Sequence, residues 1–190
     1  MKVRTWSLLA LTIALAALLA LSCAKKAPKQ EAAPPADTTK ARPISYVSEE
    51  VNFGMYFDEA GTKRTLKLDK GQKTLTAYLI LNFPAGMKIS AVEYRISLPK
   101  GLEIDTDKAF KDIVAHLGRF EDGISETFPC ESGPRIILHT FTMKVTGPLS
   151  NAEIMILPDP QAKFLGVAMC EENMPTMPAS SFKAIVNPTE

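Results

Sequence analysis

The sequence contains 190 residues with a formal net charge of +1, and this length suits one domain with a sizeable core. Charge is unevenly distributed along it, because residues 44–190 carry 15 basic and 19 acidic side chains, a net charge of −4. An acidic domain argues against nucleic acid as a partner, since nucleic-acid-binding domains present a basic face.

The N-terminal segment has the three parts of a secretory signal. Lys2 and Arg4 give it a positive start, residues 6–21 are almost entirely Leu and Ala, and the tetrapeptide ALSC ends the run at Cys23. This pattern is typical of cleaved export signals. The tetrapeptide resembles the lipobox of bacterial lipoproteins. That resemblance implies a signal peptide at 1–22, cleavage before Cys23 and attachment of a lipid such as palmitate to the cysteine.

An uncleaved membrane helix is the alternative for this segment. The apolar run is close to the roughly 20 residues that a membrane span needs, but the position of Cys23 at its end favours the lipoprotein. Ala24 follows the cysteine in place of Asp, which by resemblance to the enterobacterial sorting rule favours the outer membrane over the inner one. We therefore expect a lipid-anchored protein of the cell envelope, with the membrane as one partner.

Residues 23–43 are predicted to form a tether between the lipid and the domain. The segment after Cys23 has four prolines and no aromatic residue, too little apolar surface to offset the entropy of folding. Its five basic and two acidic residues would suit contact with anionic lipid headgroups, although a plain soluble stalk is the favoured interpretation. The folded domain is expected at residues 44–190.

In the domain, apolar residues mostly recur at every second position, as in β-strands. Apolar and polar side chains alternate over 74–83, 91–98 and 136–145. Further strands are predicted at 52–57, 64–68, 124–128, 152–156, 164–169 and 182–186. Turns rich in Gly, Pro and Asp separate these segments. Many short strands at this spacing predict a β-sandwich or β-barrel.

The segment 107–117 departs from this period. Phe110, Ile113, Val114 and Leu117 have the i, i+3, i+4, i+7 spacing of an amphipathic helix, with Asp107 placed to cap it. A short helix and a strand at 113–117 are equally consistent with the pattern.

Two longer stretches carry a resemblance to a known domain. The run LDKGQKTLTAYLILNFPAGMKISAVEYRISLPKGLEI, followed later by IILHTFTMKVTG, resembles cohesin-type domains. Residues 51–188 as a whole resemble a group of secreted bacterial Ig-like or cohesin-like β-sandwiches, through VNFGMYFDEAGT, DGISETFPC, GPLSNAEI, GVAMCEEN and AIVNPT. The resemblance implies an all-β fold, a single sandwich of about 8–9 strands with at most one short helix. Cohesins bind dockerins through one sheet face, but that surface does not transfer to individual residues here.

Cys130 and Cys170 are expected to form a disulfide. They are an even pair in a chain predicted to enter an oxidising compartment. The alternatives are a redox-active pair and a thiolate metal site. Neither is supported, because the two cysteines lack Cys-x-x-Cys spacing.

Two sets of side chains suggest metal sites. Sulfur and imidazole ligands suit copper and occur at Met169, Cys170, Met174 and Met177 and at His139 and Met143. Carboxylates suit Ca²⁺ and concentrate at Glu103, Asp105, Asp107 and Asp112. On one strand His139 and Met143 would lie about 13 Å apart, and the acidic run lacks the glycine and closing Glu of an EF-hand. We therefore predict no metal site and no cofactor.

The sequence predicts no catalytic residues. His116 and His139 are the only histidines available as imidazole bases, and neither lies near a nucleophile turn such as Gly-x-Ser-x-Gly. We therefore expect a protein that is not an enzyme.

A non-catalytic module that binds a protein partner is the favoured function. Interfaces are rich in aromatic residues, Met and Arg, so the preferred contact surface comprises Met169, Met174 and Met177. The prolines at 175 and 178 cannot donate to a sheet ladder, which predicts a loop there. A structural or assembly role in the envelope is one alternative. Glycan or metal binding is another, although the aromatic residues of the domain mostly fit its core.

Overall fold

The computed structural model describes residues 51–189. Cys23, the predicted signal and the predicted tether lie outside this range, as does the predicted start of the domain at residue 44. Residues 51–189 contain no helix, and hence no helix there is long and apolar enough to cross a membrane.

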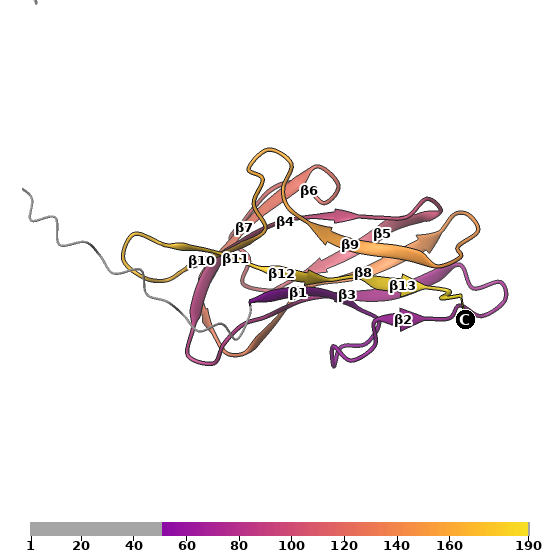
Figure 1. The fold of residues 1–190 in the computed structure, drawn as a ribbon, viewed down its shortest axis with the longest axis horizontal. Coiled ribbons are helices and arrows are strands. Elements are labelled where there is room, and N and C mark those ends of the chain that lie inside the picture. The colour runs from indigo at the N-terminus through magenta and orange to yellow at the C-terminus, as the bar shows by residue number, and fades with distance from the viewer. Residues whose placement is uncertain (1–50, 190) are drawn as a thin grey trace, which may run out of the picture. The chain divides into compact units, whose positions relative to one another are not determined.

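Thirteen strands make up the described part, and they pack as two sheets (Figure 1). Four of them are only two or three residues long, which leaves nine longer ones. The strands are β1 (Asn52–Tyr56), β2 (Thr65–Leu66), β3 (Thr74–Asn82), β4 (Lys88–Ser97), β5 (Leu102–Ala109), β6 (Ala115–Arg119), β7 (Gly123–Ser132), β8 (Arg135–Val145), β9 (Ala152–Leu157), β10 (Gly166–Met169), β11 (Thr176–Pro178), β12 (Ser180–Phe182) and β13 (Ala184–Val186).

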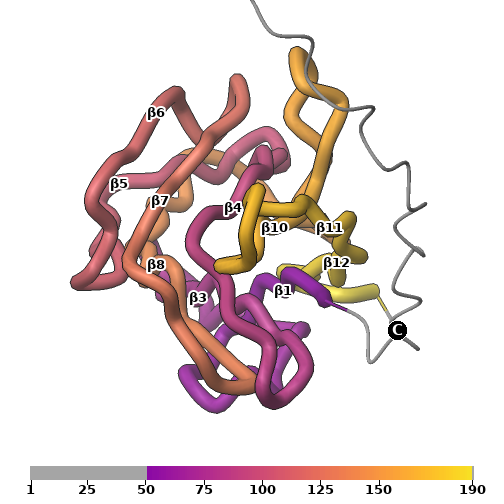
Figure 2. Tube along the Cα trace, turned by 90° about the vertical axis from the view of Figure 1, so that its left-hand side faces the viewer, coloured from indigo at the N-terminus to yellow at the C-terminus, as the bar shows by residue number. Residues whose placement is uncertain are grey.

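The first sheet has five strands in the order β12-β1-β3-β8-β5. The second has eight, with the path β11-β10-β4-β9-β13-β2 and with β7 and β6 joined to it through β4. Strands β5, β6, β7 and β8 gather on one side of the domain, and β1, β10, β11 and β12 on the other (Figure 2). The chain crosses between the sheets several times, and one of these crossings is the turn between β5 and β6.

The core lies between the two sheets and follows the predicted alternation. Leu75, Ala77, Leu79 and Leu81 of β3 are buried, as are Val92, Tyr94 and Ile96 of β4. Phe53 and Tyr94 meet across the two sheets with ring centroids 5.6 Å apart. Burial of these faces is the main apolar contribution to folding, and it confirms the predicted all-β sandwich.

The segment 107–117 contains strands and a turn instead of a helix. Residues 102–109 form β5, which pairs with β8 over seven positions, and the amide of Ile113 donates to the Phe110 carbonyl in the connecting turn. Pairing with β8 and with β7 satisfies the backbone groups that a helix would have satisfied internally. The apolar residues therefore have helical spacing only by coincidence, because they lie in and around a turn that joins two edge strands.

The segment predicted as a loop around Met174 is partly a strand. Thr176–Pro178 form β11, an edge strand paired with β10, with Val167 opposite Met177. An edge strand tolerates proline because one side of it needs no ladder donor.

Candidate functional site

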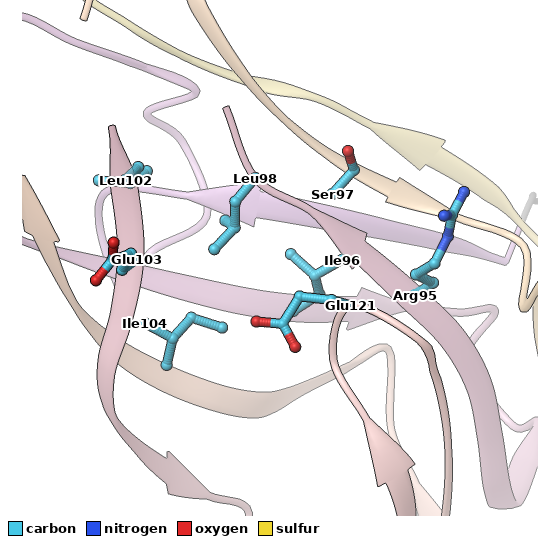
Figure 3. Close-up of a pocket in the computed structure, with 8 residues that line it drawn as sticks. All are labelled: Arg95, Ile96, Ser97, Leu98, Leu102, Glu103, Ile104 and Glu121. Atoms are coloured by element: carbon cyan, nitrogen blue, oxygen red, sulfur yellow. The ribbon is translucent and has the colours of Figure 1, made fainter. Parts of the chain in front are cut away.

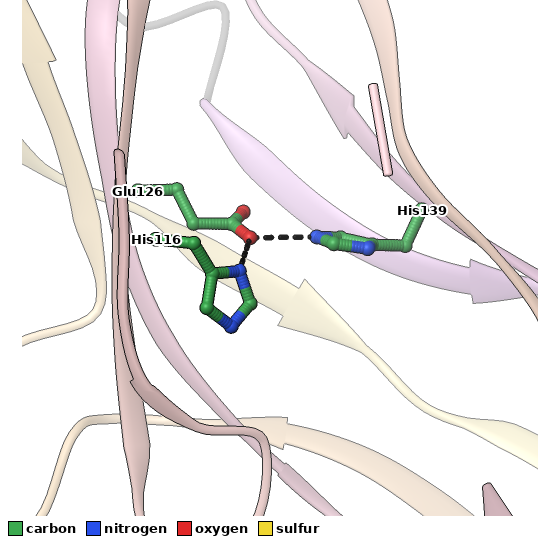
Figure 4. A group of neighbouring side chains, drawn as sticks. All are labelled: His116, Glu126 and His139. Carbon is green, nitrogen blue, oxygen red and sulfur yellow. Dashed lines mark hydrogen bonds and ion pairs between the residues drawn. The ribbon is translucent and has the colours of Figure 1, made fainter. Parts of the chain in front are cut away.

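A cluster of ionisable side chains lies between the two sheets on the β5–β8 side. His116 on β6 and Glu126 on β7 face each other across the antiparallel ladder, and His139 approaches from β8 of the other sheet. The Nδ1 atom of His116 is 2.7 Å from Glu126 Oε1, and the Nε2 atom of His139 is 2.8 Å from the same oxygen (Figure 4). We refer to these three residues as the His–Glu–His cluster.

Glu126 occupies a position that the strand period assigns to the core. Ile124, Glu126 and Phe128 alternate on the buried face of β7, and Glu126 is fully buried. Burial of a carboxylate is costly unless its charge is paired and its lone pairs are satisfied. Three donors on the described side chains meet this need, because Tyr94 donates to Oε2 at 3.0 Å while both histidines approach Oε1.

His139 faces the cluster because β8 contains a bulge. In the β3–β8 ladder Leu79 pairs with His139 and Ile80 pairs with Ile137, so Leu138 is an extra residue on β8. An extra residue shifts all later side chains to the other face. Leu138 and His139 are consequently both fully buried, and Phe141 and Met143 continue the inward face.

A second bulge brings Asp107 to His139. In the β5–β8 ladder Ile104 pairs with Met143 and Thr106 pairs with Thr142, which leaves Asp105 as the extra residue. Asp107 then turns towards His139, and its Oδ2 lies 2.9 Å from Nδ1 of the ring. Both ring nitrogens of His139 thus lie at hydrogen-bond distance from carboxylate oxygens.

Tyr94 and two phenylalanines surround the cluster. Burial raises the pKa of Tyr94 well above its ordinary value, and the negative charges of Glu126 and Asp107 add to this shift. Phe141 stacks on His139 with centroids 5.3 Å apart, and Phe120 packs edge-on against both histidines. Only His116 is partly open to solvent, with 39% of its side chain exposed.

The cluster gives no support to nucleophilic catalysis. Within the described residues the side-chain hydrogen bonds of the two histidines go to Glu126 and Asp107, and none goes to a Ser, Thr or Cys. The residue types do suit two other roles. They can tie the two sheets together by charge-assisted hydrogen bonds, and they can supply imidazole and carboxylate ligands to a metal ion.

Both histidines stand out in the sequence, whereas their partner Glu126 was not predicted as a site residue. A usable signal existed, since an acidic residue between Ile124 and Phe128 is a charge at a core position of a predicted strand. The two bulges, in contrast, leave no mark in a hydrophobic pattern. The sequence therefore could not indicate that His116 and His139 meet.

A pocket of about 480 Å³ lies between the end of β4, the start of β5 and the β6–β7 turn. Figure 3 shows Ile96, Leu98 and Ile104 pointing towards one another, with the Glu121 carboxylate beside them. None of the three cluster residues lines this pocket.

The predicted disulfide is confirmed. Cys130 of β7 is bonded to Cys170, which follows β10, with a Cα–Cα distance of 5.9 Å. The β4–β7 ladder is irregular at this point, where two steps from Ile89 to Ala91 oppose four steps from Glu131 to Thr127. Pro129 lies within the irregular part, as expected for a residue that cannot donate to the ladder.

The predicted methionine surface is only partly exposed. Met174 is 55% exposed and has a φ of 44°. It lies in a turn in which its amide donates a hydrogen bond to the Glu171 carbonyl. Met177 is half-buried on β11, and Met169 is 5% exposed. Met169 therefore belongs to the core side of β10, where it lines a hollow with Met87 and Pro84, and cannot protrude towards a partner.

The structure does not assemble the two metal sites weighed in the sequence. Met143 is fully buried in the first sheet, whereas Met169 and Met177 lie on paired strands of the second. Of the acidic residues, Asp107 binds His139 while Asp112 pairs with Lys111 in the β5–β6 turn. The four acidic residues form no group of neighbouring ligands in residues 51–189.

The fold is similar to that of cohesin modules of known structure. The seventh ScaB type I cohesin of Pseudobacteroides cellulosolvens is 11% identical with a TM-score of 0.53, covering 74% of this chain and 92% of that one. A non-cellulosomal cohesin of Archaeoglobus fulgidus is 7% identical with a TM-score of 0.51, covering 74% and 92%. A type III cohesin module from the ScaE cell-surface anchoring scaffoldin of Ruminococcus flavefaciens is 10% identical with a TM-score of 0.51, covering 74% and 88%.

No family model matches the sequence, and no curated protein matches it. The structural likeness at these identities concerns the fold alone. It confirms the cohesin-like sandwich that the sequence predicted.

Proposed function

We propose that this chain is a lipid-anchored protein of the bacterial cell envelope whose sandwich binds a protein partner without catalysing a reaction. The cohesin-like fold supports a protein ligand, because cohesins bind dockerins through a sheet face. The ALSC tetrapeptide ending at Cys23 supports the lipid anchor, and Ala24 supports the outer membrane as its location.

The observation that carries the proposal is an apolar edge strand. Val114 and Leu117 are 71% and 68% exposed, the largest values among the bulky apolar residues of the described part. Leu117 lies on β6, which pairs with β7 and has no second partner strand within residues 51–189. Edge strands in natural proteins are usually protected by charge, proline or a covering segment, since they template pairing with another chain. An edge with exposed Val and Leu suits a partner that adds a strand or packs an apolar face there.

Met174 is the next most exposed bulky apolar residue after Val114 and Leu117, and it belongs to the surface favoured by the sequence. It lies beyond Cys170, and the turn around it is bounded on one side by the disulfide. A photoreactive amino acid can therefore be placed at Leu117 and at Met174 to compare the two surfaces, with the exposed Lys67 as control.

We expect a discrete crosslinked adduct in intact cells from Leu117, and none from Lys67. An adduct from Met174 alone would place the partner contact at the turn next to the disulfide. Absence of adducts from all three positions, together with turnover of an envelope polymer by the purified chain, would contradict a non-catalytic binding module.

The anchor has its own test. Cys23→Ser is expected to abolish incorporation of a fatty-acid analogue and to leave unprocessed precursor in the membrane fraction. Cys130→Ser is the matched control, because it removes a cysteine of the folded domain and leaves the lipobox intact. Equal labelling of wild type and Cys23→Ser would exclude lipidation at this residue.

A further inference from the structure

We propose that the His–Glu–His cluster is a transition-metal site, with Zn²⁺ as its best-suited ion. The ligands are Nδ1 of His116, Oε1 of Glu126 and Nε2 of His139, which all lie within 4.8 Å of one another. The sequence does not indicate this site, because its residues are separated by 10 and 13 positions and form no local motif. The fold brings them together from three strands and both sheets.

The two N···O separations in the cluster are somewhat shorter than those of a zinc site. Protein nitrogen and oxygen ligands lie about 2.0–2.2 Å from tetrahedral Zn²⁺, so pairs of them are roughly 3.3 Å apart. The two N···O distances in the cluster are 2.7 and 2.8 Å. Each imidazole must therefore withdraw from Glu126 by about half an ångström to admit the ion. His116 has room for this movement, since its side chain is 39% exposed on an edge strand.

The groups behind the ligands have the arrangement that orients metal-binding side chains. A ligating histidine generally donates its other ring N–H to a carboxylate or carbonyl, which fixes the tautomer that turns a lone pair to the metal. Asp107 takes this part for His139, at 2.9 Å from Nδ1. Tyr94 takes the corresponding part for Glu126 by donating to the oxygen that the histidines do not contact.

Charge and ligand type select the ion. Two imidazoles and one carboxylate suit Zn²⁺, Cu²⁺ or Ni²⁺ and are poor ligands for Ca²⁺ and Mg²⁺, which prefer oxygen. Nδ1 of His116 and Nε2 of His139 each lie at hydrogen-bond distance from Oε1 of Glu126. A divalent ion would enter between these atoms, so that both nitrogens bind it through their lone pairs. Water on the exposed side of His116 completes a tetrahedral shell.

Zinc binding to the full chain, purified in detergent and stripped with a chelator, tests the proposal. Calorimetric titration with ZnCl₂ is expected to show one saturable site per chain, and CaCl₂ to show none. Co²⁺ in place of zinc should give the visible absorption bands of a tetrahedral site. His116→Ala is expected to abolish the site, while Asp107→Asn should weaken zinc binding by about 10–100-fold.

Arg119→Ala is the matched control, because Arg119 lies on the same strand with 77% of its side chain exposed and contacts no cluster residue. It should bind zinc as the wild type does. The proposal is overturned if the wild type shows no saturable zinc binding, or if His116→Ala and Asp107→Asn both bind zinc as tightly as the wild type. Either result would assign the cluster to a purely hydrogen-bonded tie between the sheets.

Discussion

Two regions of the domain hold strands together by means other than apolar burial, and they do so in opposite ways. The His–Glu–His cluster with Asp107 and Tyr94 joins the two sheets, because its members come from β5 and β8 on one side and β4, β6 and β7 on the other. The Cys130–Cys170 bond joins β7 to the end of β10, two strands that both pair with β4 of one sheet. One tie sets how the sheets face each other, and the other braces a single sheet.

The two ties also differ in where their free energy arises. A disulfide stabilises mainly by limiting the unfolded chain, so its loss leaves the native hydrogen bonds intact. The polar cluster acts within the native state, where removal of one partner leaves a buried charge or donor uncompensated. This contrast predicts that loss of Glu126, on which three donors converge, is more damaging than loss of the cross-link.

The largest effect is expected from Glu126→Ala. The substitution leaves His139 fully buried without its acceptor at Nε2 and removes the acceptor of the Tyr94 hydroxyl. We expect the free energy of unfolding to fall by about 3–5 kcal/mol. Urea denaturation measures it, with a chelator in the buffer to keep metal ions out of the cluster. Glu121→Ala, an exposed carboxylate in the adjoining turn, should change it by less than about 0.5 kcal/mol. Equal effects of the two substitutions would mean that the cluster is not a native-state tie.

The next effect is expected from loss of the disulfide in the Cys130→Ala/Cys170→Ala variant. The bond closes a loop with a sequence separation of 40, and its removal should lower the free energy of unfolding by about 2–4 kcal/mol. Refolded protein should retain the cluster, seen as unchanged near-ultraviolet circular dichroism of Tyr94 and the surrounding aromatic residues. A loss of that signal at temperatures where the variant is folded would show that the two ties are coupled.

The same comparison explains which features were predictable. Strand β3 is predicted at 74–83 and is found at Thr74–Asn82, because buried apolar side chains recur at every second position from Leu75 to Leu81. The disulfide followed from the parity of cysteines in an exported domain. These predictions depend on period and composition, which the sequence displays directly.

The cluster depends on strand register and bulges, which the alternation of apolar and polar residues does not reveal. The alternation over 136–145 offered two possible inward faces, and β8 uses both, with Leu138 on the first and His139 on the second. Strand β5 was missed because its residues from Glu103 to Lys108 are mostly charged, and only pairing with β8 holds them extended. Register and bulges are set by the partner strands, so they appear only once the sheet is assembled.

A smaller effect is expected from Tyr94→Phe, which removes one donor and keeps the ring. Glu126 Oε2 then lacks its hydrogen bond at a fully buried position. We expect a loss of about 1–3 kcal/mol, the usual cost of an unsatisfied buried group. The packing of the Tyr94 ring against Phe53 should persist, so the slope of the urea transition should match the wild type. A changed slope would indicate loss of core structure instead of one hydrogen bond.

The smallest effect is the fall in the free energy of unfolding above pH 10. It tests the electrostatic environment of Tyr94, which donates to the cluster. Burial and the charge of Glu126 raise the pKa of Tyr94 well above 10.0, its ordinary value. Above pH 10 the unfolded chain therefore releases the phenol proton while the folded chain keeps it, so stability from this group is complete below pH 10 and falls as pH rises further. The decline contributed by one such group is at most about 1.4 kcal/mol per pH unit. Urea midpoints of the wild type should consequently fall more steeply from pH 10 to pH 11 than those of Tyr94→Phe. Parallel declines in the two proteins would mean that Tyr94 ionises in the folded state as readily as in the unfolded chain, and that the cluster is open to water.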